Sequence, residues 1–156
     1  MTDIELTPML TVKDARAVVE FYKDAFGAEE LSRQSTPTGQ FIIELSVGGE
    51  RFFAVDENPA AFNVSPPSLG GTSVRMSLVV ADPDALWGRA VAAGAKVVFP
   101  IADQPYGMRQ GRIADPAGHH WLIGKVLGPA TAPRTTGRRS RRTQARPARR
   151  VRSGRR

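Results

Sequence analysis

The spacing of hydrophobic and polar positions in the first half of the chain predicts one helix among four strands. Val18, Val19, Tyr22, Ala25 and Phe26 fall at i, i+3 and i+4 spacing, which is typical of a helix with one buried face. Asp14 suits its N-cap, and Gly27 suits its end. Strands are predicted near residues 4–12, 28–35, 40–47 and 50–56, the first of them an edge or bulged strand because it contains Pro8.

The same order of elements returns in the second half of the chain. A strand at 74–81 precedes a helix capped by Asp82 or Asp84, and further strands are expected near 95–102, 108–114 and 119–126. The landmarks of the two halves match at offsets of 68, 67 and 69 residues: Val12-Lys13-Asp14 with Val80-Ala81-Asp82, Gly27-Ala28 with Gly94-Ala95, and Gly49 with Gly118. The sequence therefore predicts a duplicated βαβββ unit.

Two hairpins occupy corresponding places in the repeat. In RIADPAGHHWLI (residues 112–123), Asp115, Pro116 and Gly118 suit a tight turn between two strands. The earlier stretch FIIELSVGGERFFAV turns at Gly48-Gly49. We expect the functional site to lie between these matching halves.

Charge and composition divide the chain at about residue 127. Residues 1–127 hold 11 Lys and Arg against 15 Asp and Glu, whereas residues 128–156 hold 11 Arg and no acid. We expect a domain at 1–127, with module one at about 4–57, a Pro/Gly-containing linker at 58–73 and module two at about 74–127. Residues 128–156 are too polar to offset the entropy of ordering, which predicts a disordered tail.

The arginine-rich tail raises the question of a nucleic-acid partner. Its charge favours phosphate backbones, but it has no aromatic residue for base stacking, so any such binding is expected to be weak, non-specific and salt-sensitive. The interpretation that we prefer is a tail without a defined role. The chain has no cysteine, no membrane span and no secretory leader at its start, which favours a cytoplasmic protein.

Four stretches carry a resemblance to a known superfamily: TPMLTVKDARAVVEFYKDAFGAEEL, IIELSVGGERFF, SPPSLGG and GMRQGRIADPAGHHW. Together with the duplication, they resemble the vicinal oxygen chelate superfamily of glyoxalases, bleomycin-resistance proteins and extradiol dioxygenases, and are most similar to its PhnB-like branch. The resemblance implies an α+β fold in which two paired βαβββ modules form an eight-stranded, U-shaped mixed sheet around a cavity. It also implies a homodimer with cavities at shared interfaces.

The metal-dependent enzymes of this superfamily hold a divalent ion in that cavity, with one ligand from the first strand and one from a later strand of each module. The resemblance maps those four positions onto Thr7, Glu44, Arg75 and Leu122. Only Glu44 is a metal ligand of the usual kind, since an arginine guanidinium has no lone pair to donate. We therefore expect no metal cofactor, although a divalent metal stays open as an alternative.

Strand alternation predicts which side chains share the cavity. Arg75 lies on one face with Ser77 and Val79, and Glu44 shares its face with Ile42 and Ser46. If the modules pair as the resemblance implies, Arg75 faces Glu44. The guanidinium then replaces the metal charge and binds Glu44 or an anionic or carbonyl group of a ligand. The alternative is a structural ion pair without a ligand.

The two adjacent histidines face opposite sides of a strand. His119 follows the turn, so we expect it to bond local backbone, while His120 shares parity with Leu122 and points toward the cavity. A non-catalytic His120 is the simpler interpretation; the alternatives are a general base and, with Glu44, part of a displaced metal site. Other candidates for the pocket wall are Phe41, Phe53, Tyr106, Met108 and Trp121, with Arg109 and Arg112 steering an anionic ligand.

These observations favour a glyoxalase/bleomycin-resistance-like protein that binds a small, partly apolar molecule between its modules. The alternative is an enzyme, a metal-dependent lyase or dioxygenase with a rearranged metal site including Glu44 and His120. Donor count in the cavity separates the two hypotheses. Glu44 and His120 are the only convincing candidates in the sequence, which favours binding over metal catalysis.

Overall fold

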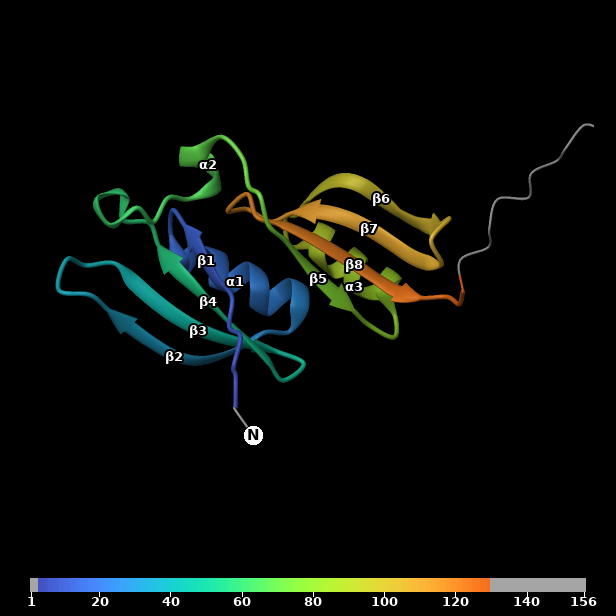
Figure 1. The fold of residues 1–156 in the computed structure, drawn as a ribbon, viewed down its shortest axis with the longest axis horizontal. Helices are drawn as coiled ribbons and strands as arrows, with labels where there is room; N and C mark the ends of the chain where they lie inside the picture. The colour runs from blue at the N-terminus through green and yellow to red at the C-terminus, as the bar shows by residue number, and fades with distance from the viewer. Residues whose placement is uncertain (1–2, 130–156) are drawn as a thin grey trace, which may run out of the picture.

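The computed structural model describes residues 3–129, which fold into two similar α+β units lying side by side (Figure 1). Each unit has the order strand, helix, strand, strand, strand. The elements are β1 (Met9–Val12), α1 (Ala15–Phe26), β2 (Glu29–Ser35), β3 (Phe41–Val47), β4 (Glu50–Asp56), η1 (Pro59–Ala61), α2 (Pro66–Leu69), β5 (Arg75–Val79), α3 (Pro83–Ala92), β6 (Lys96–Gln104), β7 (Met108–Ala114) and β8 (His120–Val126). The predicted duplication of a βαβββ unit is confirmed.

The strands form two four-stranded mixed sheets with matching topology. The orders are β1-β4-β3-β2 and β5-β8-β7-β6, and in each sheet the first strand runs parallel to the last while the other neighbours are antiparallel. The sequence predicted an eight-stranded sheet. Among the described residues the eight strands are divided between two hydrogen-bonded sheets, because β1 and β5 are edge strands that pair with β4 and β8 only.

Both long helices begin at an aspartate that the sequence repeat aligns. The Asp14 carboxylate accepts a hydrogen bond from the Ala17 amide at 3.1 Å, and Asp82 accepts one from the Ala85 amide at 3.0 Å. Each side chain thus satisfies an amide that the first helical turn leaves without a partner. Gly27 ends α1 in the left-handed region at φ 68°, which a residue without Cβ adopts at little cost.

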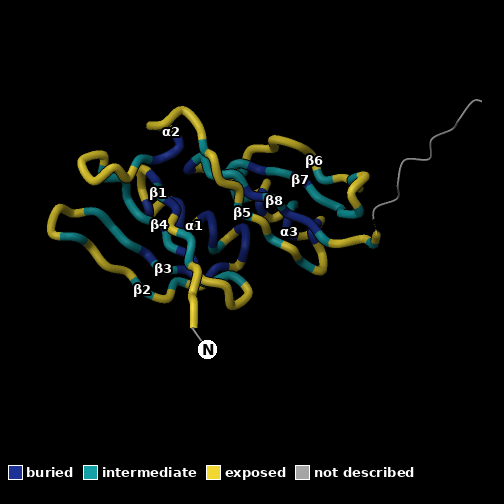
Figure 2. The backbone as a smooth tube through the Cα atoms, in the orientation of Figure 1, coloured by how far each residue is buried: buried dark blue, intermediate teal, exposed yellow. Residues whose placement is uncertain are grey.

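Each sheet has one face covered by a helix and one uncovered face. In the first sheet, Ile43, Leu45 and Phe52 are buried under α1, whereas Met9 on the other face is 60% exposed. In β5 the burial alternates along the strand, and the three residues predicted to share a face, Arg75, Ser77 and Val79, are all exposed. Figure 2 shows the dark, buried stretches concentrated on the helices and the central strands.

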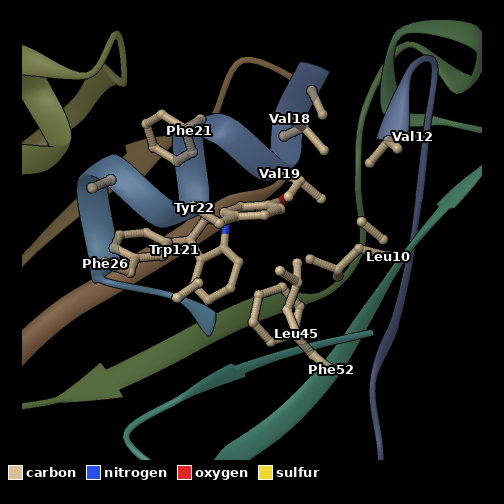
Figure 3. Packing of buried hydrophobic residues seen from close by; sticks show 14 of the residues in the cluster. Leu10, Val12, Val18, Val19, Phe21, Tyr22, Phe26, Leu45, Phe52 and Trp121 are labelled. Atoms are coloured by element: carbon tan, nitrogen blue, oxygen red, sulfur yellow. The ribbon is translucent and has the colours of Figure 1, made fainter. Parts of the chain in front are cut away.

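One continuous core joins the two units. Trp121 of β8 is 1% exposed, and its ring packs against Tyr22 and Phe26 of α1 and Phe52 of β4, with ring centroids 4.8 to 5.7 Å apart (Figure 3). Clustered aromatic rings bury a large apolar area and add edge-to-face attraction. The indole of the second unit therefore completes the core of the first.

Three regions differ from or lie beyond the prediction. The first strand is shorter than the 4–12 expected, since β1 begins at Met9 just after Pro8. The expected linker contains two short helical turns, η1 and α2. The predicted disorder of the tail falls on residues outside the described range apart from 128–129. No helix within residues 3–129 has the length and apolar character needed to cross a membrane.

Candidate functional site

The uncovered face of the second sheet gathers polar and apolar side chains from three strands. The register pairs Arg75 of β5 with His120 of β8, and Leu122 of β8 with Arg112 of β7. Because residues two apart share a face, Arg75, His120, Leu122 and Arg112 all lie on the side away from α3. This placement confirms the predicted parity of His120 with Leu122.

A hollow of about 240 Å³ is formed on this face and in the adjoining β6–β7 turn. Its polar side chains include Arg75, Arg112 and Gln110, and its apolar ones include Phe99 and Leu122. The Tyr106 hydroxyl donates a hydrogen bond to the Gln110 side-chain oxygen at 3.0 Å. Three predicted ligand-binding residues, Arg75, Leu122 and Tyr106, therefore line one hollow. We call it the Arg75–Arg112 hollow.

Arg112 is the most constrained cation in this hollow. Its guanidinium carbon lies 5.0 Å from the centroid of the Phe99 ring, a cation–π contact. Its Nε is buried and has no hydrogen-bond partner among the described residues. A buried donor without a partner costs free energy, and an acceptor bound to this nitrogen would remove that cost.

Glu44 lies on the uncovered face of the other sheet, opposite Phe53 in the register. Its carboxylate accepts hydrogen bonds from Arg51 Nε at 2.6 Å and from the Ser32 hydroxyl at 3.3 Å. The expected Arg75–Glu44 contact is not made between described residues of one chain. Instead Arg51, which lies opposite Ser46 on β4 and diagonal to Glu44, binds the carboxylate. Thr7, another of the predicted residues, makes only a 3.3 Å hydrogen bond to Glu5.

A second hollow of about 520 Å³ lies between the two units. It is bounded by Pro8, the Val47–Gly48 end of the β3–β4 hairpin, and β5. The sequence placed the ligand-binding residues in an inter-module cavity, but of that predicted set only Trp121 reaches this one. Trp121 reaches this hollow from the buried side of β8, whereas Arg75 and Glu44 do not line it.

Trp121 and Arg109, both predicted to contact a ligand, have other partners. The Trp121 ring belongs to the buried core, and its Nε1 donates to Asp115 at 2.8 Å. Arg109 shares the helix-covered face with Gly111 and holds Asp84 of α3 through two hydrogen bonds of 2.7 Å. That pairing lowers the pKa of Asp84 and raises the pKa of Arg109. Neither residue lines the Arg75–Arg112 hollow.

His119 bonds backbone, as expected, but not local backbone. Its Nε2 lies 2.8 Å from the carbonyl oxygen of Thr11 in the other unit. The turn itself has the predicted form, since the Gly118 amide donates to the Asp115 carbonyl at 2.9 Å and Gly118 has φ 92°. The tight turn thus directs His119 toward β1 and leaves His120 on the uncovered face.

The four positions that the superfamily uses for a metal do not supply a fitting donor set. Thr7 offers a hydroxyl, Glu44 a carboxylate already held by Arg51, and Arg75 and Leu122 offer no lone pair. Residues 3–129 contain no group of three or more His, Asp or Glu side chains placed to hold a metal ion. The residues present therefore do not fit the usual ion.

The parts of the hollow that sequence reasoning missed include Gln110 and Phe99. The available signal was alternation along β7, where Met108, Gln110 and Arg112 fall on one face. Phe99 carried no usable signal, because β6 contains two register shifts that break the alternation around it.

The paired βαβββ units, each with an uncovered sheet face, define a class of cavity-forming α+β proteins. A family profile described as the glyoxalase/bleomycin resistance protein/dioxygenase superfamily matches residues 6–123. The chain belongs to this superfamily. Uncharacterized proteins of Mycobacterium tuberculosis and Mycobacterium bovis are 43% identical over 126 residues, covering 78% of this chain and 74% and 83% of theirs.

Solved structures show the same fold. TioX from Micromonospora sp. ML1 is 26% identical with a TM-score of 0.63, covering 80% of this chain and 100% of TioX. An Arabidopsis thaliana gene product is 30% identical with a TM-score of 0.61, covering 78% of this chain and 97% of its own. The Listeria monocytogenes fosfomycin resistance protein FosX, solved with Mn(II) and sulfate, is 17% identical with a TM-score of 0.59, covering 80% and 93%. At that identity the likeness to FosX concerns the fold alone.

Proposed function

We propose that this protein binds a small, partly apolar molecule against the uncovered face of its second sheet, as a homodimer in which a second copy closes the site. The observation that carries the proposal is the Arg75–Arg112 hollow, in which polar side chains surround the apolar Leu122 and Phe99. Ligand sites in proteins commonly combine an apolar wall with a few converging polar groups. The motif stretches that resemble the PhnB-like branch support the same assignment.

The apolar character of the uncovered faces supports the second copy. Val79 is 62% exposed, Phe99 57% and Met9 60%, all on sheet faces without a covering helix. A solvated sheet face normally carries polar side chains, so these exposed apolar positions indicate surfaces that another molecule covers. The hollow is also smaller than the roughly 300–1,000 Å³ of most small-molecule pockets, which fits a site completed by a partner.

Ligand binding is tested by a thermal-shift and NMR screen of small organic fragments, neutral and charged, against the full chain. We expect fragments that stabilise the protein to perturb the amide signals of β7 and β8. Leu122→Arg should abolish the binding of these fragments because the arginine side chain fills the hollow. Leu69→Arg on α2, where Leu69 is 65% exposed, is the matched control and should bind normally. Fragments that bind Leu122→Arg as well as the parent would overturn the location of the site.

The dimer is tested by size-exclusion chromatography with light scattering, which measures the molecular mass of the eluting protein. Val79→Glu should shift the molecular mass toward that of a monomer, because it places a charge on the apolar face proposed to be covered. Val91→Glu on α3, another exposed valine on the opposite side of the second sheet, should leave the mass unchanged. A parent protein that elutes as a monomer at all concentrations would contradict this part of the proposal.

A further inference from the structure

The positive charge of the Arg75–Arg112 hollow indicates which kind of small, partly apolar molecule it binds. We infer that the ligand carries an oxyanion, a carboxylate, phosphonate or phosphate group, which is bound between Arg75 and Arg112. This inference rests on the proposed function, since it names the class of molecule that the same hollow binds. It follows from the partners that the two guanidinium groups lack and from the groups that surround them.

Neither guanidinium has a carboxylate partner among residues 3–129. All 15 Asp and Glu residues lie within the described range 3–129, and no ion pair or side-chain hydrogen bond joins any of them to Arg75 or Arg112. By contrast, Arg33, Arg51 and Arg109 each hold a carboxylate. The two unpaired cations line one hollow, so an anion bound there would be attracted by both.

The geometry of Arg112 suits bidentate binding of such an anion. Its guanidinium stacks on Phe99, which limits its freedom, and its buried Nε has no partner. A planar guanidinium held in place presents two parallel N–H donors that match the oxygens of a carboxylate or phosphonate. Arg75 is exposed at the rim of the same hollow, where it supplies the second positive charge.

The remaining walls limit the rest of the ligand. The Gln110 side-chain oxygen is occupied by the Tyr106 hydroxyl, and its amide nitrogen makes only a long contact of 3.9 Å with the Met108 sulfur. Gln110 therefore offers a further donor to a ligand through this amide nitrogen. Leu122 and Phe99 offer apolar surface for a compact aromatic or aliphatic group. The hollow of about 240 Å³ thus combines positive charge with apolar surface, which fits a small organic anion rather than a cation.

A carboxylate could also come from a second copy of the chain, and Glu44 is the candidate on an uncovered sheet face. That carboxylate is already held by Arg51 and Ser32 and its side chain is only 14% exposed. A free small-molecule anion therefore accounts for the unpaired cations better than a partner's Glu44 does.

The experiment compares anionic and neutral probes of similar shape by calorimetry and NMR on the full chain. Phenylphosphonate and benzoate are the anions, and benzyl alcohol is the neutral match. We expect the anions to perturb the amide signals of β5, β7 and β8 and to bind about tenfold or more tightly than benzyl alcohol. Arg112→Gln and Arg75→Gln should remove the preference for anions over benzyl alcohol. Arg109 lies on the opposite face of the sheet, so Arg109→Gln should retain this preference.

Arg112→Lys separates geometry from charge and guards against a variant that fails to fold. It keeps the positive charge but loses the planar donor pair, so anion affinity should fall to between those of the parent and Arg112→Gln. Circular dichroism confirms folding of every variant. Benzyl alcohol binding as tightly as the anions, at this same face, would overturn the inference and leave the proposed function standing.

Two further results would also overturn the inference. One is an absence of anion-dependent shifts in the parent at millimolar concentration. The other is a gain in anion affinity in Glu44→Gln, which would show that a partner's carboxylate normally occupies the hollow. If neutral fragments also failed to bind this face, the proposed function would fail together with the inference, so the two failures are distinguishable.

Discussion

The hydroxyl of Tyr22 in α1 donates a 2.7 Å hydrogen bond to the carboxylate of Asp115, which lies 93 residues away in the turn between β7 and β8. Asp115 is 3% exposed and also accepts from Trp121 Nε1 at 2.8 Å and from the amides of Ala117 and His119 at 2.9 and 3.0 Å. Four donors satisfy this buried carboxylate, which makes its burial tolerable. Burial and the Asp115 charge raise the pKa of Tyr22 well above its usual value, so the hydroxyl keeps its proton. The turn of the second unit is thereby fixed to the helix of the first.

Removing this hydroxyl should destabilise the whole protein. Tyr22→Phe keeps the ring in the core but leaves Asp115 short of one donor, and we expect a loss of about 1.5–3 kcal/mol in the free energy of unfolding. Urea denaturation followed by circular dichroism measures it. Tyr106→Phe removes an exposed tyrosine hydroxyl bonded to Gln110 and should cost less than about 0.5 kcal/mol. Equal losses in the two variants would contradict the role assigned to Asp115.

Gly111 allows α3 to pack closely on the second sheet. A Cβ at this position would lie 2.5 Å from the Trp87 ring and 2.8 Å from the backbone of Ile101. Gly111→Ala should therefore cost about 1–3 kcal/mol through overpacking, measured by urea denaturation. Gly88→Ala is the control: its Cβ would meet nothing within 4 Å, and alanine favours a helix, so we expect a gain of about 0.5–1 kcal/mol. A neutral Gly111→Ala would show that the sheet and helix can separate freely.

Glu57 holds the linker through contacts that should stabilise the protein at neutral pH and be lost in acid. Its carboxylate binds Lys13 at 2.5 Å and accepts from the Ser65 hydroxyl at 2.6 Å, and these hydrogen bonds, that from Lys13 foremost, lower its pKa to about 2. A depressed pKa in the folded state stabilises the protein above the ordinary glutamate pKa of about 4.3, and this stabilisation disappears as the pH falls toward 2.

The difference in Tm between the parent and Glu57→Gln should therefore be largest near pH 7 and shrink progressively from about pH 4.5 toward pH 2. Thermal unfolding across that range measures it. Asp24→Asn, at an exposed acid of α1 that makes no ion pair within residues 3–129, serves as the control and should show little change in this difference. A Glu57→Gln effect that grew in acid would have the wrong sign for this explanation.

Metal loading tests the donor set directly. After dialysis and reloading with Ni, Mn, Fe or Zn, elemental analysis should find well below one ion per chain, because Thr7, Arg75 and Leu122 replace the usual donors and Arg51 holds Glu44. Near-stoichiometric metal that Glu44→Ala removes would instead support the metal-dependent lyase or dioxygenase. Screening of substrates for those reactions would then follow.

The repeated unit and most of its local structure could be predicted from short-range sequence patterns. Asp14 and Asp82 cap their helices, and Gly118 closes its turn, because these features depend on residues close together in the chain. Alternation along each strand also fixed which of its side chains share a face, grouping Arg75 with Ser77 in β5 and His120 with Leu122 in β8. These are consequences of backbone geometry at short range.

The contact partners of those faces depend on the tertiary structure and could not be predicted. Arg51 lies opposite Ser46 on β4, the strand that pairs with the strand of Glu44. From this position its guanidinium binds the Glu44 carboxylate, so Arg51 and not Arg75 is the partner of Glu44. Trp121 has a large aromatic side chain of the kind that lines ligand pockets, but the packing of α1 against β8 buries it in the core. Register between distant strands and the docking of the two units depend on the balance of many long-range contacts, which local pattern does not encode.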